Sequence, residues 1–343
     1  MATTTPALTT PVLAEERSLV PGDYANSLFH SQPWQAAVEE AFGLSIETFT
    51  PASEPDLVLS YSVIDDIRGR RVVSTPFSDF CEPGLTTAQG WVEFRDHLLS
   101  FDAPVTVRPF WTPPDFVDPT GERLGGLLWH GIDLSNGADE MFSRLKSKIR
   151  TKIRRVPKAG VTYRVSSAPE DIARMHEMHV GLRKSKYSML AQPKRFFEAL
   201  SANFCDDMVV MFAELDGEPI AGMTFFGWND VWYYKFSASY PNDVRPNVGL
   251  MMHSCRVAAE RGMQLVDMGR SDDDQPGLLA FKEQFEPIVR SLTTMRWAGT
   301  QVPDARAGEV GATLGALTAI LTRPDVPDSV AADAGDLLYR FFA

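Results

Sequence analysis

Three short runs of β-forming residues follow one another in the middle of the chain, with little between them except turn residues. Asp216-Gly217 separates the first run from the second, and Asn229-Asp230 separates the second from the third. Such pairs favour tight hairpin turns, because Asn, Asp and Gly tolerate positive φ. The sequence therefore predicts three consecutive antiparallel strands, at 208–215, 219–228 and 231–239.

Helical and strand-like patterns flank these strands in a definite order. The preceding segment predicts a strand at 161–165, a helix starting at Pro169 and a second helix after Pro193. The following segment predicts, in turn, a helix at 248–261 closed by Gly262, a strand at 264–268, a helix at 278–284 and a strand at 288–297. The resulting order, β-α-α-β-β-β-α-β-α-β, resembles that of the GNAT acyltransferase fold, so a mixed α/β domain is expected.

The first 135 residues show a weaker form of the same pattern. Its predicted elements are a helix at 33–42, strands at 57–64 and 71–75, a helix at 88–99 and strands at 105–110 and 127–134. Either an ancient duplication of the whole domain or an unrelated α/β lid domain explains this order. Beyond Gln301 the pattern predicts helices at 314–321 and 330–342, and we expect this segment to fold back onto the first domain.

Bulk properties narrow the class of protein. A chain of 343 residues suits two domains with tails, and 44% hydrophobic with 23% charged residues is typical of a soluble globular protein. The net charge of −12 makes the surface as a whole repel nucleic acid and anionic membranes. Cys81, Cys205 and Cys255 lie far apart, which argues against zinc and disulfides and fits a reducing cytoplasm. We expect a flexible tail at 1–18 and no membrane span, since no stretch reaches about 20 apolar residues.

One segment runs against the acidic balance of the chain. Between Arg144 and Lys158 there are eight basic residues and no acid, and subtracting them leaves −20 on the remainder. Apolar residues recur there at spacings of three and four, so the segment predicts one amphipathic helix with a cationic face. Either this helix contacts phosphate or nucleic acid, or it is a solvated helix between domains.

Four stretches extend the resemblance to a narrower family. Residues 152–161 (KIRRVPKAGV) resemble the basic segment of Fem-type proteins, and Phe281-Lys282-Glu283-Gln284-Phe285 resembles their FKxxFG motif. Residues 232–239 and 249–262 continue the match in register. Two departures stand out: Glu286 occupies the glycine position of the motif, and the first domain matches little beyond Pro76-Phe77-Ser78-Asp79-Phe80.

The resemblance to Fem proteins and the related BioF2-like acetyltransferase domains implies an architecture. It is two tandem GNAT-like domains, with the second inserted before the C-terminal part of the first. Here that gives a degenerate domain at 19–140 plus 298–343, and a transferase domain at 141–297 that opens with the basic helix.

The same resemblance implies a cytoplasmic transferase that moves an acyl or aminoacyl group onto an amine. The donor substrate would be aminoacyl-tRNA or acyl-CoA, with no bound cofactor or metal and no DNA partner. The acceptor would be a cell-wall precursor or an amine-bearing small molecule such as an amino-sugar or peptide metabolite.

Amine transfer by direct attack needs a positioned nucleophile, a polarised carbonyl and a held donor. The sequence shows no Ser-His-Asp or Cys-His arrangement, so direct attack is the simpler mechanism. In GNAT-like folds backbone N–H groups near 236–239 would face the donor. The candidate catalytic residues are Lys282, Asp267 and Ser237, and the candidate substrate- or phosphate-binding residues are Lys148, Lys152, Arg154, Arg155, Lys235, Arg245, Asn247 and Arg270.

Three functional hypotheses follow. A Fem-like aminoacyltransferase explains the basic helix. It also explains the turn at 245–250: GNAT enzymes that use CoA resemble R/Q-x-x-G-x-G/A at this point, whereas this chain has Val248 and Leu250 at the glycine positions, which makes the turn poorly suited to CoA. An acyl-CoA-dependent N-acetyltransferase of BioF2-like type requires the fold alone. A non-catalytic module would bind a phosphorylated glycan or RNA. His253 is expected in a core, and His176 and His179 show no third metal ligand.

Overall fold

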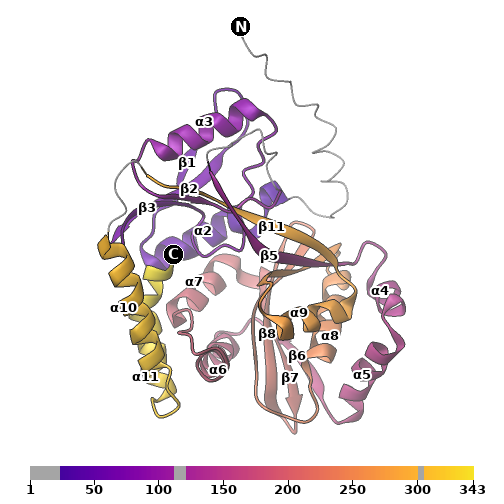
Figure 1. Cartoon of the computed structure of the whole chain (residues 1–343). Helices are drawn as coiled ribbons and strands as arrows, with labels where there is room; N and C mark the ends of the chain where they lie inside the picture. Colours follow the sequence, from indigo (N-terminus) through magenta and orange to yellow (C-terminus); the bar gives the residue numbers. More distant parts are fainter. Residues whose placement is uncertain (1–23, 112–120, 300–304) are drawn as a thin grey trace.

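The computed structural model describes residues 24–111, 121–299 and 305–343 (Figure 1). The tail predicted at 1–18 lies outside these residues. The first part of the chain forms α2 (Gln32–Phe42), β1 (Glu47–Phe49), β2 (Leu59–Asp66), β3 (Gly69–Ser74), α3 (Ala88–Leu99), β4 (Val105–Val107) and β5 (Glu122–Asp133), with short 3-10 turns at Tyr24–Asn26 and Leu28–His30. The two predicted helices and the predicted hairpin of this region are confirmed.

The following segment has the predicted order of elements. It contains α4 (Ala138–Arg144), α5 (Ser147–Lys158), β6 (Thr162–Ser166), α6 (Pro169–Tyr187), α7 (Lys194–Phe204), β7 (Met208–Leu215), β8 (Glu218–Trp228), β9 (Val231–Ser239), α8 (Asn247–Glu260), β10 (Leu265–Asp272), α9 (Pro276–Lys282) and β11 (Ile288–Trp297). Positive φ angles of 54° at Asp216, 84° at Gly217 and 54° at Asn229 confirm both tight turns.

All the strands join into one mixed sheet, which makes the chain an α/β protein. The strand order is β1-β2-β3-β4-β11-β5-β10-β9-β8-β7-β6. β11 pairs antiparallel with β4 on one side and with β5 on the other, while β10 pairs antiparallel with β5 and parallel with β9. The sheet therefore runs through both predicted domains, and the boundaries 19–140, 141–297 and 298–343 remain a prediction.

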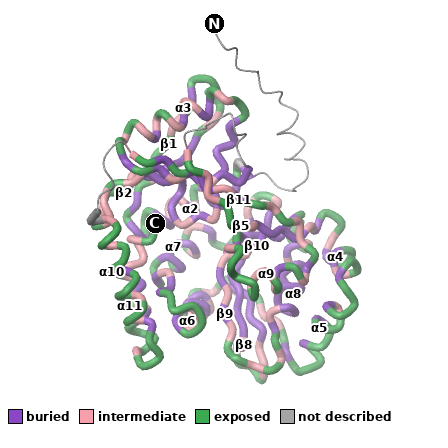
Figure 2. The backbone as a smooth tube through the Cα atoms, in the orientation of Figure 1, coloured by how far each residue is buried: buried purple, intermediate pink, exposed green. Residues whose placement is uncertain are grey.

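Helices cover both faces of the sheet around separate cores (Figures 1 and 2). On one face α2, α6 and α7 pack their apolar side chains into a core that includes Trp34, Met175 and Phe197. On the other face α4, α5 and α8 enclose a second core that includes Ile153 and Leu250. Burial of these large side chains supplies the main stabilisation, roughly 1.5–3 kcal/mol for each.

The predicted basic helix is broken into two, which corrects the expectation of a single helix. α4 ends at Arg144, and Leu145 and Lys146 have extended ψ angles of 145° and 140° before α5 starts at Ser147. Leu145 is 2% exposed and lies in the same core as Met141 and Ile149. With this break, both short helices direct apolar residues onto α8.

The C-terminal segment forms α10 (Ala305–Leu321), α11 (Asp328–Leu338) and a 3-10 turn at Tyr339–Phe342. It folds back, as expected, and Arg68 donates a hydrogen bond of 2.7 Å to the carbonyl of Phe341. It also contacts the other unit, since Lys184 on α6 forms an ion pair of 2.8 Å with Asp328. Among the described residues, no helix is both long and apolar enough to cross a membrane.

Candidate active site

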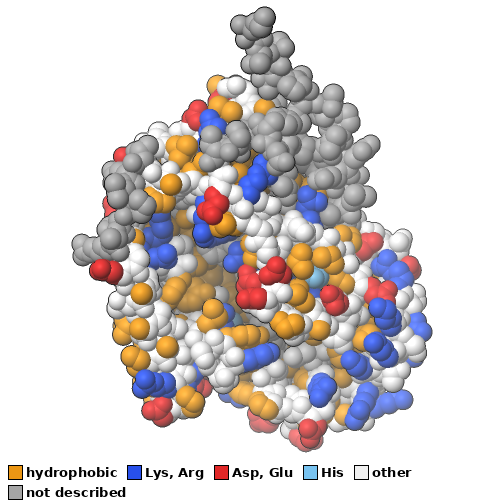
Figure 3. All heavy atoms as spheres, in the orientation of Figure 1, with side chains coloured by type: hydrophobic (Ala, Val, Ile, Leu, Met, Phe, Trp, Pro, Cys, Tyr) orange, Lys and Arg blue, Asp and Glu red, His pale blue; other side chains and the backbone are white. Residues whose placement is uncertain are grey.

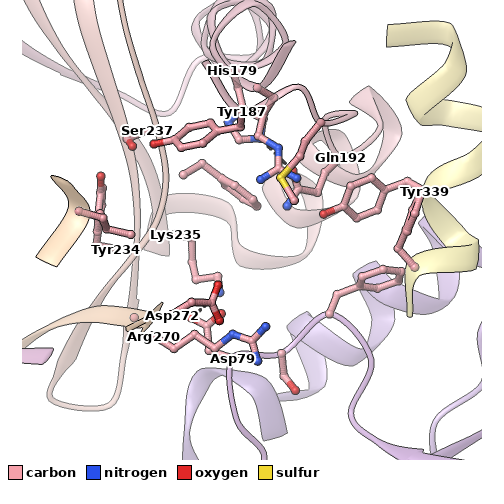
Figure 4. A pocket seen from close by; sticks show the side chains of 18 of the residues that line it. Asp79, His179, Tyr187, Gln192, Tyr234, Lys235, Ser237, Arg270, Asp272 and Tyr339 are labelled. Carbon is pink, nitrogen blue, oxygen red and sulfur yellow. Dashed lines mark hydrogen bonds and ion pairs between the residues drawn. The ribbon is translucent and has the colours of Figure 1, made fainter. Parts of the chain in front are cut away.

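A cavity of about 590 Å³ opens beside the sheet, between α6 on one side and β9 and β10 on the other. Its walls come from distant parts of the chain: residues 77–79 after β3, Arg108 after β4, the ends of β9 and β10, Lys282 on α9, and the C-terminal turn. Figure 3 shows a hollow on this side of the molecule, and Figure 4 shows the side chains around it.

The cavity begins where two parallel strands separate. β9 pairs with β10 only over Val231–Tyr233 and Leu265–Asp267, after which β10 continues along β5. From Tyr234 onward β9 therefore has β8 as its partner on one edge and a gap on the other. The residues predicted to present backbone N–H groups, 236–239, lie along this gap.

A β-bulge in β9 directs Lys235 into the cavity. Thr224 of β8 is paired with Phe236 and the next residue, Phe225, with Tyr234, so Lys235 is an extra residue in the ladder. Its Nζ forms an ion pair of 2.9 Å with Asp79 Oδ2 and lies 4.7 Å from the centroid of the Phe29 ring. Figure 4 shows Tyr234 pointing away from Lys235, on the other side of the strand.

Asp79 packs closely against β10, and this contact requires a glycine at position 269. Burial alone would raise the pKa of Asp79, but the charges of Lys235 and Arg270 outweigh it and lower the pKa below its ordinary value. Gly269 has a φ of 68°, and a Cβ atom there would lie 3.0 Å from Asp79 Oδ2. Glycine at 269 therefore permits both the left-handed backbone and the close approach of the carboxylate.

Lys282 lines the cavity although its side chain is almost wholly enclosed, at 1% exposure. Its Nζ donates hydrogen bonds of 2.7 Å to the carbonyl of Gly269 and 3.2 Å to that of Arg270. Burial lowers the pKa of Lys282 to about 8. A third N–H remains available for a ligand oxygen, since an ammonium group has three donors.

Asp267 lies behind Lys282 and does not line the cavity. It is 1% exposed, and its Oδ1 accepts a 2.6 Å hydrogen bond from the backbone N–H of Gly269. Burial raises the pKa of Asp267 to about 6. Asp267, Gly269 and Lys282 thus form one hydrogen-bonded series that fixes the Lys282 ammonium group at the wall.

Four of the predicted site residues line the cavity together: Ser237, Lys235, Arg270 and Lys282. Four others lie on α5 and are exposed at the surface, away from the cavity: Lys148, Lys152, Arg154 and Arg155. Arg245 and Asn247 lie at the start of α8, where Asn247 Nδ2 is 3.5 Å from Ser239 Oγ. The predicted set therefore divides between a cavity and a surface.

Close packing around the first turn of α8 explains why the helix has a glycine there. A Cβ atom at Gly249 would lie 2.2 Å from Tyr163 Oη and 3.1 Å from Val156 Cβ. Val248 and Leu250, at the expected glycine positions of a CoA turn, are both buried. Gly249 thus permits close packing of α8 on α5 and Tyr163.

A cysteine–histidine pair is present, which corrects the expectation that there is none. Cys81 Sγ lies 3.2 Å from His30 Nε2 and 3.1 Å from Thr75 Oγ1. Burial would raise the pKa of the thiol, but His30 and the hydrogen bond from Thr75 lower it. The two residues are 51 positions apart in the sequence, so no local pattern could indicate their contact.

The three histidines of α6 and α8 have structural contacts. His176 Nε2 is 3.0 Å from the carbonyl of Gln192, and His179 Nε2 is 2.8 Å from Gln192 Oε1. His253 stacks on the Tyr163 ring at 4.8 Å between centroids and is half-buried, so it is not fully in a core. No group of three potential metal ligands occurs within 24–111, 121–299 and 305–343.

Several cavity residues carry no signal in the sequence. They are Arg108, Arg183, Tyr187, Gln192, Tyr339 and Phe342. Each lies outside any motif, and tertiary folding alone brings them together. Figure 4 shows Tyr187, Gln192 and Tyr339 on the side of the cavity opposite Lys235, Asp79 and Arg270.

Comparison with known proteins identifies the fold around this cavity. Residues 143–283 match the family described as acetyltransferase (GNAT) domain. The structure of FemX superposes with a TM-score of 0.63 at 13% identity, covering 85% of this chain and 96% of that one. A search of the curated proteins found no match.

Two further structures share the fold. The C-terminal domain of a putative lysylphosphatidylglycerol synthetase from Agrobacterium fabrum has a TM-score of 0.54 at 14% identity, covering 83% of this chain and 92% of that one. L-PGS from Bacillus licheniformis has a TM-score of 0.52 at 12% identity, covering 81% and 90%.

Proposed function

We propose that this chain, an acyltransferase of the Fem-like GNAT group, moves an aminoacyl group from charged tRNA onto an amine by direct attack. The observation that carries the proposal is the unpaired cationic surface of α5, beside a domain whose CoA turn lacks the usual glycines. The acceptor amine would enter the cavity, and the donor ester would reach it through the gap between β9 and β10.

The basic residues of α5 support a polyanionic donor. Lys148, Lys152, Arg154 and Arg155 are exposed, and within the described part of the chain none of them forms an ion pair. Figure 3 shows blue side chains gathered along the edge where α4 and α5 lie. Such a surface on a chain with a net charge of −12 favours a partner with regularly spaced phosphates.

The placement of α5 agrees with this assignment. α5 packs on α8, on the face of the sheet opposite α6 and α7. The start of α8 lies beside the end of β9, because Asn247 approaches Ser239. A donor bound over α5 would therefore lie on one face of the sheet, while the acceptor cavity lies on the other.

The proposed chemistry uses the buried ammonium group of Lys282. The neutral acceptor amine attacks the ester carbonyl, a C–N bond forms, and the ester C–O bond breaks. The amine proton passes to the departing ribose oxygen. Below pH 8 Lys282 is mostly protonated, so its free N–H can stabilise the negative charge that develops on the carbonyl oxygen.

The test is transfer from labelled aminoacyl-tRNA to small amines and peptide acceptors, with and without prior RNase treatment. The double variant Lys152→Glu/Arg155→Glu should lower transfer and tRNA binding at least tenfold, because both contacts become repulsive. Lys194→Glu, on the exposed surface of α7, is the charge-reversal control; it removes a surface ion pair with Glu198 but should leave transfer and tRNA binding unchanged. Transfer that resists RNase, or that ignores the double variant, would contradict the proposal.

A second candidate rests on the family match, which is to an acetyltransferase domain. If acyl-CoA is the donor, saturating CoA should raise the free energy of unfolding by about 2.7 kcal/mol at a concentration of 100 Kd. Thermal unfolding with and without CoA measures this directly. A clear shift would favour acyl-CoA over tRNA.

A further inference from the structure

The cavity is positively charged in a chain that is acidic overall. Five basic side chains line it, and they face only two acidic side chains, Asp79 and Asp272: the five are Arg108, Arg183, Lys235, Arg270 and Lys282. The whole chain, by contrast, has a net charge of −12. An excess of positive charge in a partly enclosed space repels cations and attracts anions.

Three of these five groups have protein partners. Lys235 is paired with Asp79, Lys282 donates to two carbonyl groups, and Arg183 Nε donates to the carbonyl of Leu190 at 3.2 Å. The guanidinium groups of Arg108 and Arg270 form no hydrogen bond or ion pair with any described residue.

Arg108 is the more unusual of the two. Its side chain is half-buried, and burial together with the charges of Arg270 and Arg296 lowers its pKa to about 10, although the nearby Cys81 and Asp79 oppose this shift. A half-buried guanidinium group that forms no hydrogen bond or ion pair is costly, and two neighbouring cations raise that cost. An anion between the guanidinium groups of Arg108 and Arg270 would remove both penalties.

The two arginines also lie beside the proposed reaction centre. The carbonyl of Arg270 accepts a hydrogen bond from Lys282, so this residue is fixed next to the ammonium group. The carbonyl of Arg108 accepts a 2.7 Å hydrogen bond from the backbone N–H of Cys81, which ties it to the loop carrying Asp79. Figure 4 shows Arg270, Asp79 and Lys235 together at one end of the cavity.

We propose that Arg108 and Arg270 form an oxyanion subsite, so that the acceptor carries a carboxylate or phosphate group close to its reacting amine. The proposal rests on the proposed function, because it assigns the cavity to the acceptor. Guanidinium groups suit this role, since their planar N–H forks bind two oxygens of one carboxylate or phosphate. The acceptor class is thus an amine-bearing acid and not a simple alkylamine.

Binding of two simple anions without any donor tests the subsite. Thermal unfolding and isothermal titration would be measured with sodium phosphate and sodium acetate, at constant ionic strength set with sodium chloride. The Kd of the preferred anion should rise at least tenfold in Arg270→Gln and in Arg108→Gln. Arg256→Gln, which removes an exposed charge from α8, is the control and should bind as the wild type does.

The outcomes separate the two anion sources and the two proposals. Tighter phosphate binding indicates a phosphorylated acceptor, and tighter acetate binding indicates a carboxylate. Binding that is equal in the wild type and in Arg270→Gln overturns the subsite, and because Arg270 is exposed this variant is expected to fold even where Arg108→Gln does not. A failed transfer assay with intact anion binding would instead reject only the aminoacyl donor.

Discussion

Basic residues cluster both in the cavity and on the surface of α5, but their surroundings differ: the cavity lysines are enclosed or paired, whereas those on α5 are exposed to water. In the cavity Lys282 is 1% exposed and bonded to two carbonyls, and Lys235 is paired with Asp79. On α5, Lys152 and Arg155 are exposed in water, where an unpaired charge costs little. Substitutions should therefore have large and specific effects in the cavity, and small effects on stability at α5.

The largest effect is expected at Lys282. Lys282→Met removes the ammonium group but keeps the length of the side chain, and the transfer rate should fall about 10²–10³-fold, the usual loss for one donor to an oxyanion. Single-turnover transfer kinetics would measure it, with Lys194→Met on the exposed surface of α7 as the control. Equal rates in both variants would show that Lys282 has no part in the reaction.

The same residue predicts a pH dependence of stability. The pKa of Lys282 falls from 10.5 to about 8 on folding, so the unfolded chain binds more protons between these values. The free energy of unfolding should therefore rise as pH increases from about 8 to 10.5, by on the order of 2–3 kcal/mol. Urea unfolding of wild type and Lys282→Met isolates this contribution, and a constant difference across the range would refute it.

A third prediction compares two glycines in helices. Gly249→Ala should destabilise the fold by about 1–3 kcal/mol, because the new methyl group would overlap Tyr163 Oη, 2.2 Å away. Gly311→Ala on α10 meets nothing within 4 Å and should stabilise by about 0.5–1 kcal/mol. Denaturant midpoints measure both, and the same sign for both would contradict the packing argument.

The smallest effect is expected at the surface of α5. Arg155→Gln should change the free energy of unfolding by no more than about 0.5 kcal/mol, since its side chain is exposed and unpaired. Its effect should appear in salt-dependent polyanion binding alone. A large loss of stability would indicate that α5 is a structural support and not a binding surface.

The sequence predicts the elements better than the site. Hairpin signals such as Asp216-Gly217 are local, because the residue types themselves determine the turn, and β7 and β9 match their predicted bounds. The break at Leu145 was missed, since it depends on how two short helices pack on α8.

Site residues were predicted where they lay near a motif, as Lys282 does. Arg108 and Tyr339 could not be predicted, because their place in the cavity depends on strand pairings and on the return of the C-terminal segment. The same is true of Cys81 and His30, whose contact spans 51 positions.

β11 has a mechanical consequence. Its backbone is hydrogen-bonded to β4 on one edge and to β5 on the other. Any hinge motion between the two predicted domains, 19–140 and 141–297, would therefore have to break a ladder of backbone hydrogen bonds. The Lys235–Asp79 ion pair also joins these two predicted domains and would be stretched by the same movement. We therefore expect the walls of the cavity to keep their spacing through a catalytic cycle. Substrate exchange would then depend on local motion of α10 and the C-terminal turn, which line the cavity through Thr318, Tyr339 and Phe342.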